Sequence, residues 1–254
     1  MTPVRRLRRR LQACELSRRP LSRSRVQKQK YDPAPPRRES RPESRPESRP
    51  VIRLLHALDV CFARIYHRLT IHSSCRLPRD GPAILVCNHT SGLDPLLIQS
   101  ACPRLITWMM AREWYDMRGL HWVFKTVGAI PVDRSGRDLA ATRAALRALE
   151  AGRILGVFPE GRIEPTRDLL PFQTGVAMMA IKSSVPIYTA YLDGAQRGRD
   201  MGAAILQPSI AQLAFGASPV QIERSSTSRE SLEQATEDVK RAVLALQKFV
   251  DARR

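Results

Sequence analysis

Residues 84–95 read ILVCNHTSGLDP, and this stretch decides the fold. Its first five residues form a short apolar run, which is typical of a buried strand. The polar residues that follow predict a loop leading into a helix over 93–101, whose first turn accommodates Pro95. A strand, a loop and a helix in this order make one unit of an α/β fold.

The same alternation continues along the chain. Further strands are predicted at 105–110, 130–132, 154–158, 186–192, 203–207 and 220–223, and further helices at 137–151, 173–183 and from Thr227 onward. Thr227 and Glu230 have the spacing of a capping box at the start of that last helix. The pattern predicts a single α/β domain with a mostly central, buried sheet flanked by helices.

An amphipathic helix is predicted at the start of the ordered chain. Its apolar residues fall on one helical face: Val51, Leu54, Leu55, Leu58, Phe62, Ile65 and Leu69. Arginines and histidines fall mostly elsewhere, which gives the helix a basic flank. Two interpretations stay open at this point: a helix packed on the core, or an interfacial membrane anchor.

Residues 1–50 are predicted to be a disordered basic tail, and residues 51–254 the folded domain. The tail holds 8 of the 19 prolines and no glycine, and residues 39–50 repeat ESRP three times. Proline at every fourth position excludes a continuous helix there, and the repeat has nothing apolar to bury. Nearer the start, Val4, Leu7, Leu11 and Cys14 have helical spacing among arginines. A short basic helix on a membrane and an organellar transit peptide are the alternatives to a solvated tail.

Charge and composition limit the classes of partner. The chain has 42 Lys and Arg against 24 Asp and Glu, a net charge of +18, and residues 1–50 supply 16 − 5 = +11 of it. This excess favours anionic lipid, phosphorylated substrates or nucleic acid. With 43% hydrophobic residues, collagen-like, coiled-coil and wholly disordered chains are excluded. Five cysteines without CxxC spacing indicate a reducing compartment. The sequence contains no run of about 18 apolar residues, so a membrane-spanning helix is not expected.

His89 and Asp94 are the first candidates for chemistry. His89 directly follows an apolar strand, and Ser91 and Gly92 allow the chain to fold back so that Asp94 can approach the imidazole. An imidazole acting as a general base needs one free nitrogen, while a carboxylate on the other nitrogen fixes the tautomer. The alternative is that Asp94 only caps the helix that contains Pro95 and that His89 is an ordinary loop residue.

Three further blocks are candidates, and the first two place charged residues just after extended segments. Residues 128–134 read GAIPVDR and end on Arg134, residues 158–164 read FPEGRIE and contain Glu160, Gly161 and Arg162, and residues 185–188 read VPIY. An arginine in such a place suits a phosphate or a carboxylate. Each block alone is equally consistent with a surface turn or the start of a strand.

Taken together and in order, NHTSGLD (88–94), GAIPVDR, FPEGRIE and VPIY resemble the blocks of the glycerolipid acyltransferase family, which includes 1-acylglycerol-3-phosphate acyltransferases. The segment PFQTGVA (171–177) is similar to that family's PFKxG segment, and the resemblance spans roughly residues 51–215. In the family the third block usually reads Glu-Gly-Thr-Arg-Ser, so the arginine at position 162 stands one place earlier here.

The resemblance implies transfer of a fatty acyl group from acyl-CoA or acyl carrier protein to a lysophospholipid hydroxyl, with 1-acylglycerol-3-phosphate as the expected acceptor. His89 is implied as the general base and Asp94 as its partner. Arg134 and Arg162 are implied to hold the acceptor's phosphate, with Glu160 and Gly161 beside its glycerol. The thioester is already activated, so neither a metal nor a cofactor is expected.

The substrates of such an enzyme are amphiphiles, so the resemblance also implies a peripheral protein on the cytoplasmic face of a membrane. The basic helix 51–69, the aromatic patch around Trp108–Phe124 and the cationic tail are the expected contacts. The alternative function is a basic protein that binds nucleic acid or membrane and carries an inactive acyltransferase-like domain. No nucleic-acid recognition motif is present, so a specific nucleic-acid partner is not expected.

Overall fold

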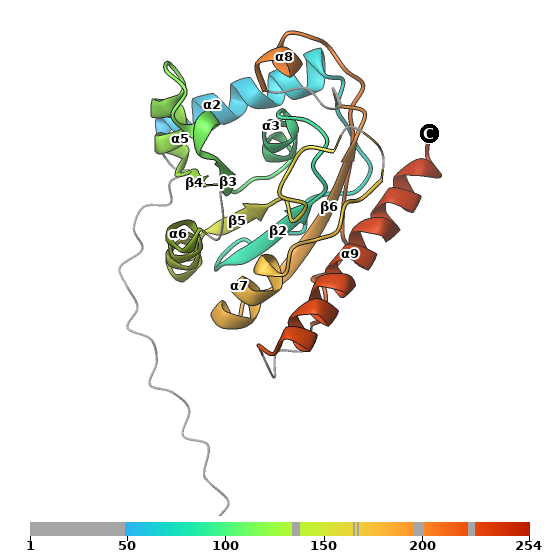
Figure 1. The fold of residues 1–254 in the computed structure, drawn as a ribbon. Coiled ribbons are helices and arrows are strands. Elements are labelled where there is room, and N and C mark those ends of the chain that lie inside the picture. Colours follow the sequence, from blue (N-terminus) through green and yellow to red (C-terminus); the bar gives the residue numbers. More distant parts are fainter. Residues whose placement is uncertain (1–48, 134–137, 165, 167, 196–200, 223–226) are drawn as a thin grey trace, which may run out of the picture. The chain divides into compact units, whose positions relative to one another are not determined.

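A single mixed sheet organises the part of the chain that the structure describes. The computed structural model describes residues 49–133, 138–164, 166, 168–195, 201–222 and 227–254, and the predicted tail of residues 1–50 therefore lies almost entirely outside it. The sheet has seven strands in the order β1-β7-β6-β2-β5-β3-β4 (Figure 1). The domain boundary predicted at residue 51 stays a prediction.

The central strands are short and buried. The strands are β1 (Thr70–Ile71), β2 (Ala83–Cys87), β3 (Ile106–Ala111), β4 (Ile130–Val132), β5 (Ile154–Val157), β6 (Ile187–Asp193) and β7 (Gln212–Phe215). From β6 to β4 every neighbouring pair is parallel, whereas β7 runs antiparallel to β6. All five residues of β2 are buried, as expected for the middle of a parallel sheet covered on both faces.

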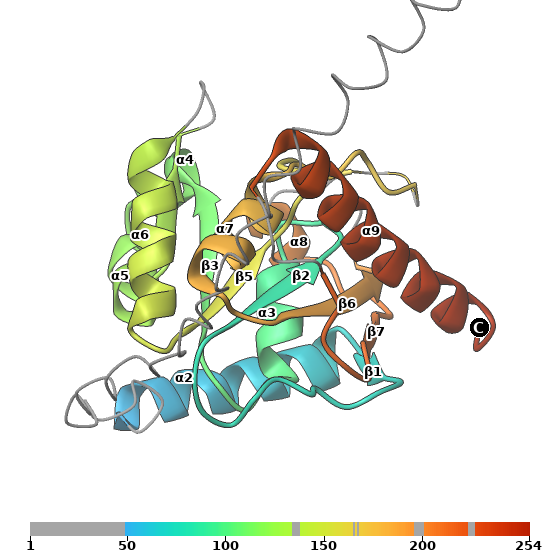
Figure 2. The same ribbon diagram turned by 90° about the horizontal axis from the view of Figure 1, so that it is seen from below.

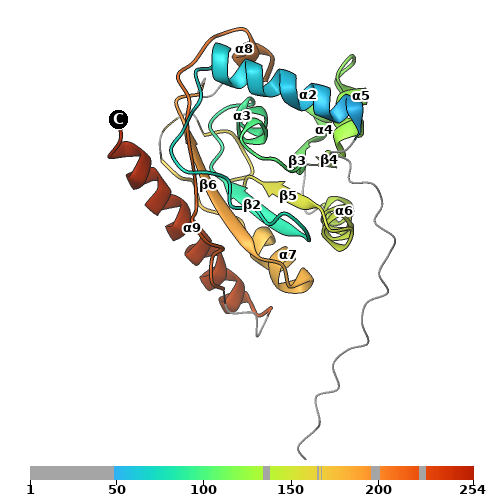
Figure 3. The ribbon, with the colours of Figure 1, turned by 180° about the vertical axis from the view of Figure 1, so that it is seen from behind.

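Helices cover both faces of the sheet. They are α2 (Pro50–Cys61), α3 (Asp94–Ser100), α4 (Arg112–Tyr115), α5 (His121–Val127), α6 (Leu139–Glu150), α7 (Gly175–Ser183), α8 (Met201–Ile205) and α9 (Arg229–Asp251), with a π-helical turn η2 (Phe62–Tyr66) after α2. Helices α2, α3 and α8 lie on one side, and α6, α7 and α9 on the other (Figure 1 and, from behind, Figure 3). This arrangement confirms the predicted α/β class.

Two late strands were predicted wrongly. Residues 203–207 belong to helix α8 and its end, because a short apolar run has no periodicity that separates a strand from a buried helical turn. At 220–223 only Val220 forms an isolated bridge, to Ile187, and Glu223 lies outside the described residues. Strands β1 and β7, which pair with each other at one end of the sheet, were missed because each has only two to four residues.

The last helix begins one residue later than the predicted capping box. The N-cap of α9 is Ser228, whose Oγ accepts a hydrogen bond from the Ser231 N–H at 3.2 Å. Thr227 therefore precedes the cap. The helix itself is confirmed, and it buries Ala235, Val239, Val243 and Val250 against the sheet.

Helix α2 packs on α3 with a face different from the predicted one (Figure 2). The buried residues of α2 and η2 are Ile52 and Ala63, whereas Leu54, Leu58 and Ile65 are 60%, 58% and 76% exposed. Helix α2 is therefore a core-packing helix that also carries an outward apolar stripe. The two interpretations of the sequence are not exclusive.

Asp59 lies on α2, and its Oδ2 is buried without a hydrogen-bond partner among the described residues. Burial raises the pKa of this carboxyl to about 7. Because the folded state then holds a proton that the unfolded state releases near pH 4, stability falls as the pH rises from about 4 through 7.

We expect Asp59→Asn to raise the free energy of unfolding, relative to the wild type, by roughly 1–3 kcal/mol more at pH 8 than at pH 5. Urea unfolding of both proteins at the two pH values measures this difference. An equal gain at pH 5 and pH 8 would contradict the raised pKa of Asp59, because over most of this range the folded wild type holds a proton that the unfolded state has released.

Candidate active site

Asn88 ends strand β2 and fixes the backbone from which His89 projects. Its Nδ2 donates to the carbonyl oxygen of Leu192, and its Oδ1 accepts from the Leu192 N–H, both at 2.9 Å. The side chain thus continues the pairing with β6 that the backbone of β2 makes up to Cys87. The backbone of His89 is released from the sheet at this point, at the carboxyl edge where loops of parallel sheets carry functional groups.

His89 and Asp94 are brought together as predicted. The Nδ1 of His89 lies 3.0 Å from Oδ2 of Asp94, and the Asp94 carboxylate is fully buried. The same Oδ2 accepts from the N–H groups of Thr90 at 2.7 Å and Ser91 at 2.9 Å. These amides precede α3 and are not part of its first turn, so the carboxylate organises the loop and the imidazole and does not cap the helix.

The three contacts on Oδ2 of Asp94 determine how the imidazole is protonated. A backbone N–H can only donate, so the two amides make Oδ2 an acceptor, and Nδ1 of His89 carries the proton in the third bond. The neutral ring then has its lone pair on Nε2, for which the described residues provide no hydrogen-bond partner. The site therefore presents an imidazole nitrogen that can take a proton.

The His89 ring is held by an aromatic stack that sequence reasoning missed. It stacks on Phe158 at a centroid distance of 4.0 Å, and Phe158 stacks on Trp108 at 4.9 Å. Gly156, paired with Trp108 across the sheet, leaves the space that this indole fills, because a Cβ there would lie 2.4 Å from the ring. A glycine inside a buried strand was the available signal for such close packing. Trp108 is therefore buried and is not a surface residue of the predicted aromatic patch.

Glu160 connects the loops that follow β2 and β5. These strands are parallel neighbours, so their carboxyl ends lie side by side. The Oε1 of Glu160 accepts from the His89 N–H at 3.1 Å, and its Oε2 accepts from the Leu170 N–H at 3.2 Å. Burial raises the pKa of this carboxyl, while the two amides oppose the rise. Both oxygens bind backbone, so Glu160 positions the His89 loop.

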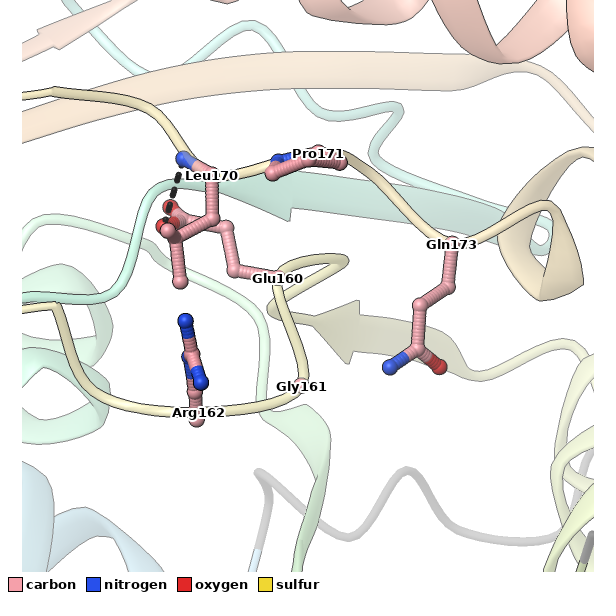
Figure 4. A pocket seen from close by; sticks show the side chains of 6 residues that line it. All are labelled: Glu160, Gly161, Arg162, Leu170, Pro171 and Gln173. Carbon is pink, nitrogen blue, oxygen red and sulfur yellow. Dashed lines mark hydrogen bonds between the residues drawn. The ribbon is translucent and has the colours of Figure 1, made fainter.

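A small pocket of about 310 Å³ lies beside Glu160 (Figure 4). Its lining consists of Glu160, Gly161, Arg162, Leu170, Pro171 and Gln173. Gly161 has φ +71°, a left-handed conformation that favours glycine and turns the chain so that Arg162 follows at the pocket's edge. Arg162 is exposed, and its guanidinium reaches toward the Glu160 and Leu170 side of the pocket (Figure 4). The pocket brings together the guanidinium of Arg162 and the carboxamide of Gln173, two donors suited to an oxyanion, beside the Glu160 carboxylate, whose oxygens both accept from backbone N–H groups.

A larger cavity of about 880 Å³ shares Gly161 and Gln173 with the small pocket. His89 lines it together with apolar side chains from β3, β4, α6 and α7, among them Met109, Val132, Leu146, Val176 and Met179. Two cations, Arg143 and Lys182, also line it. The cavity is thus largely apolar and places the imidazole in its wall, an arrangement suited to an aliphatic chain that ends in a reactive group.

Arg134, the other predicted phosphate ligand, lies outside the described residues. The residues on either side of this gap, Asp133 and Asp138, both line the larger cavity, and Asp138 Oδ2 accepts from the Asp133 N–H at 2.9 Å. The role of Arg134 stays a prediction. Within the described ranges, no group of three or more His, Cys, Asp or Glu is arranged to hold a metal ion.

Among the described helices, none is both long enough and apolar enough to cross a membrane.

Comparisons with known proteins agree with the geometry. The acyltransferase family model matches residues 68–193, which contain His89, Asp94, Glu160 and Arg162. The 1-acyl-sn-glycerol-3-phosphate acyltransferase of Bacillus subtilis is 24% identical over 132 residues, which cover 52% of this chain and 65% of that protein. The enzyme of the same name from Haemophilus influenzae is 32% identical over 136 residues, covering 50% and 55%.

The fold has a counterpart among solved structures. The 1-acyl-sn-glycerophosphate acyltransferase of Thermotoga maritima superposes with a TM-score of 0.59 at 24% identity, covering 76% of this chain and 81% of that one. The chain matches between half and two thirds of the length of the two curated relatives named above. Through residues 68–193, this chain belongs to the acyltransferase family.

Proposed function

We propose that this protein transfers a fatty acyl group from an acyl thioester to the free hydroxyl of a lysophospholipid, with 1-acylglycerol-3-phosphate as the acceptor. The observation that carries the proposal is the His89–Asp94 pair at 3.0 Å, set in the wall of an apolar cavity. The relatives named as 1-acyl-sn-glycerol-3-phosphate acyltransferases support the choice of acceptor.

The proposed reaction needs two proton transfers at His89. As the acceptor oxygen attacks the thioester carbonyl, Nε2 of His89 takes the hydroxyl proton, and Asp94 stabilises the imidazolium that forms. The tetrahedral intermediate then expels the thiolate, which takes the proton from His89 and leaves as a free thiol. The donor thioester supplies its own activation, so the proposal requires neither a metal nor a cofactor.

The two cavities suggest places for the two substrates. The larger, apolar cavity suits the acyl chain, and the small pocket with Arg162 suits the acceptor phosphate. We propose Arg134 as a second phosphate ligand, because its segment joins Asp133 to Asp138 at the cavity wall. Either acyl-CoA or acyl carrier protein fits the proposal as donor.

We further propose that the protein lies on the cytoplasmic face of a membrane through the α2 side. The support is the outward stripe of Leu54, Leu58 and Ile65, which continues toward α8 because the Tyr66 hydroxyl donates to the Leu206 carbonyl at 3.0 Å. Leu206 is 77% exposed, and arginines flank the stripe. The free cysteines among the described residues fit a reducing compartment.

The first prediction concerns the general base. His89→Ala should lower the transfer of labelled acyl groups from acyl-CoA to 1-acylglycerol-3-phosphate by at least roughly 10²–10⁴-fold, because general-base catalysis contributes about that much. Far-ultraviolet circular dichroism should be unchanged, since His89 projects from a loop. Turnover by His89→Ala near that of the wild type would contradict the role of His89 as general base.

Asp94→Asn is the partner of that experiment. The amide should still accept from the loop through Oδ1 but should favour the wrong imidazole tautomer, so most activity should be lost. If Asp94→Asn keeps its activity and only melts at a lower temperature, Asp94 stabilises the loop and has no role in orienting His89 for catalysis.

The second prediction in this group concerns the acceptor phosphate. Arg162→Ala and Arg134→Ala should each raise the KM for the lysophospholipid about ten- to hundredfold, the effect of losing a charge-assisted hydrogen bond of about 1.5–3 kcal/mol. The donor KM should not change, and Arg147→Ala, an exposed arginine outside both cavities, is the matched control. If the donor KM rises instead, the phosphate site belongs to the other substrate.

A third prediction tests membrane contact. Leu54→Asp together with Leu58→Asp should weaken sedimentation with anionic vesicles more than tenfold, because inserting each leucine contributes about 1.5–3 kcal/mol. Activity in detergent should persist. The control for added charge is the double variant Thr227→Asp, Gln234→Asp, which places the same charge at the start of α9. An equal loss of vesicle binding in both double variants would contradict membrane contact through the α2 surface.

A further inference from the structure

Gln173 stands at the junction of the two cavities. Among the residues that line the small pocket, only Gly161 and Gln173 also line the larger cavity that contains His89. A ligand that reaches from the Arg162 pocket to the imidazole therefore passes these two residues. Because glycine has no side chain, Gln173 supplies the side chain that the two linings share.

The place of Gln173 is fixed from both sides. Its backbone N–H donates to the carbonyl oxygen of Pro159 at 2.9 Å, which ties it to the turn after β5. Its side chain occupies the space that a side chain at position 161 would take, since a Cβ on Gly161 would lie 2.4 Å from Nε2 of Gln173. The glycine at 161 thus allows the carboxamide to lie across the turn, with its end directed toward Gly161 (Figure 4).

The carboxamide itself makes no hydrogen bond to the described residues, and the side chain is exposed. A carboxamide offers two N–H donors and one carbonyl acceptor. It can therefore bind a phosphate oxygen without adding charge to the pocket, whereas lysine would add a positive charge and glutamate a negative one.

We propose that Gln173 is a specificity-determining residue for the acyl acceptor, whose carboxamide donates a hydrogen bond to the phosphate that Arg162 binds and whose neutrality sets the preference between headgroups. The proposal rests on the proposed acyl transfer and names a residue that discriminates between acyl acceptors. A phosphomonoester carries nearly two negative charges at pH 7 and a phosphodiester only one. A neutral side chain at this junction favours the dianion less strongly than a cation would.

Three variants test the proposal: Gln173→Ala, Gln173→Glu and Gln173→Lys. For each, kcat and KM are measured with 1-acylglycerol-3-phosphate and with lysophosphatidylglycerol at saturating acyl-CoA. Gln173→Ala should raise both acceptor KM values about 3- to 10-fold, the effect of one lost neutral hydrogen bond, with the donor KM and kcat within about twofold. Gln173→Glu should raise them further, because it repels phosphate.

Gln173→Lys should change the preference. In Gln173→Lys, the ratio of kcat/KM for 1-acylglycerol-3-phosphate to kcat/KM for lysophosphatidylglycerol should rise at least about fivefold. In Gln173→Glu the same ratio should fall, because the added unit charge next to the phosphate has the opposite sign. The matched control is Gln207, an exposed glutamine after α8 that lines neither cavity. Its Ala, Glu and Lys variants should leave both the acceptor KM and the ratio unchanged.

The outcomes separate this inference from the proposed function. Acyl transfer by the wild type together with unchanged acceptor KM values and an unchanged ratio in all three Gln173 variants overturns the role of Gln173 and leaves the function standing. A rise in donor KM alone also overturns it. A wild-type protein that transfers acyl groups to neither acceptor overturns the proposed function, and this inference with it.

Discussion

The carboxyl group of Asp94 is completely buried, and a buried carboxylate is costly unless hydrogen bonds satisfy it. Its Oδ2 is satisfied by the amides of Thr90 and Ser91 and by the ring of His89. The loop after β2 must therefore fold back on itself, and the imidazole must present Nδ1 to the carboxylate. One acceptor atom thus determines the loop conformation, the orientation of the ring and the nitrogen that remains for chemistry.

The sheet supplies the second constraint. Because β2 and β5 are parallel neighbours, the loops that carry His89 and Glu160 leave the same edge. Glu160 joins these loops through backbone amides, and Phe158 stacks on the His89 ring. The ring is thus held from its edge by Asp94 and from its face by Phe158. Such restraint lowers the cost of orienting the base when a substrate hydroxyl arrives.

Much of this arrangement follows from the sequence. The apolar runs at 84–88 and 154–158 predicted the two central strands because buried parallel strands are short, continuous and apolar. A turn at Ser91 and Gly92 allowed His89 to approach Asp94, but only the resemblance of the four blocks to one family favoured this pairing over a helix cap at Asp94. The order of the four blocks then pointed to one family, and the match over residues 68–193 agrees with it.

Other features depend on contacts between distant residues. The side-chain pairing of Asn88 with Leu192 and the stacking of Trp108 on Phe158 join segments that no local periodicity connects. The outward face of α2 could not be predicted, because Leu54 and Ile52 are equally apolar and only packing on α3 decides which is buried. Part of helix α8 was taken for a strand because the four apolar residues 203–206 fit either structure.

The protonation state of the His89 ring is the most direct test of the account. Nitrogen-15 NMR of the imidazole in the intact protein, at a pH where the ring is neutral, distinguishes a proton on Nδ1 from one on Nε2. We expect the Nδ1–H tautomer, with no proton on Nε2 and with the Nδ1–H group donating to Asp94. A proton on Nε2 would contradict it, because that ring could neither donate to the buried carboxylate nor accept a proton from a substrate hydroxyl.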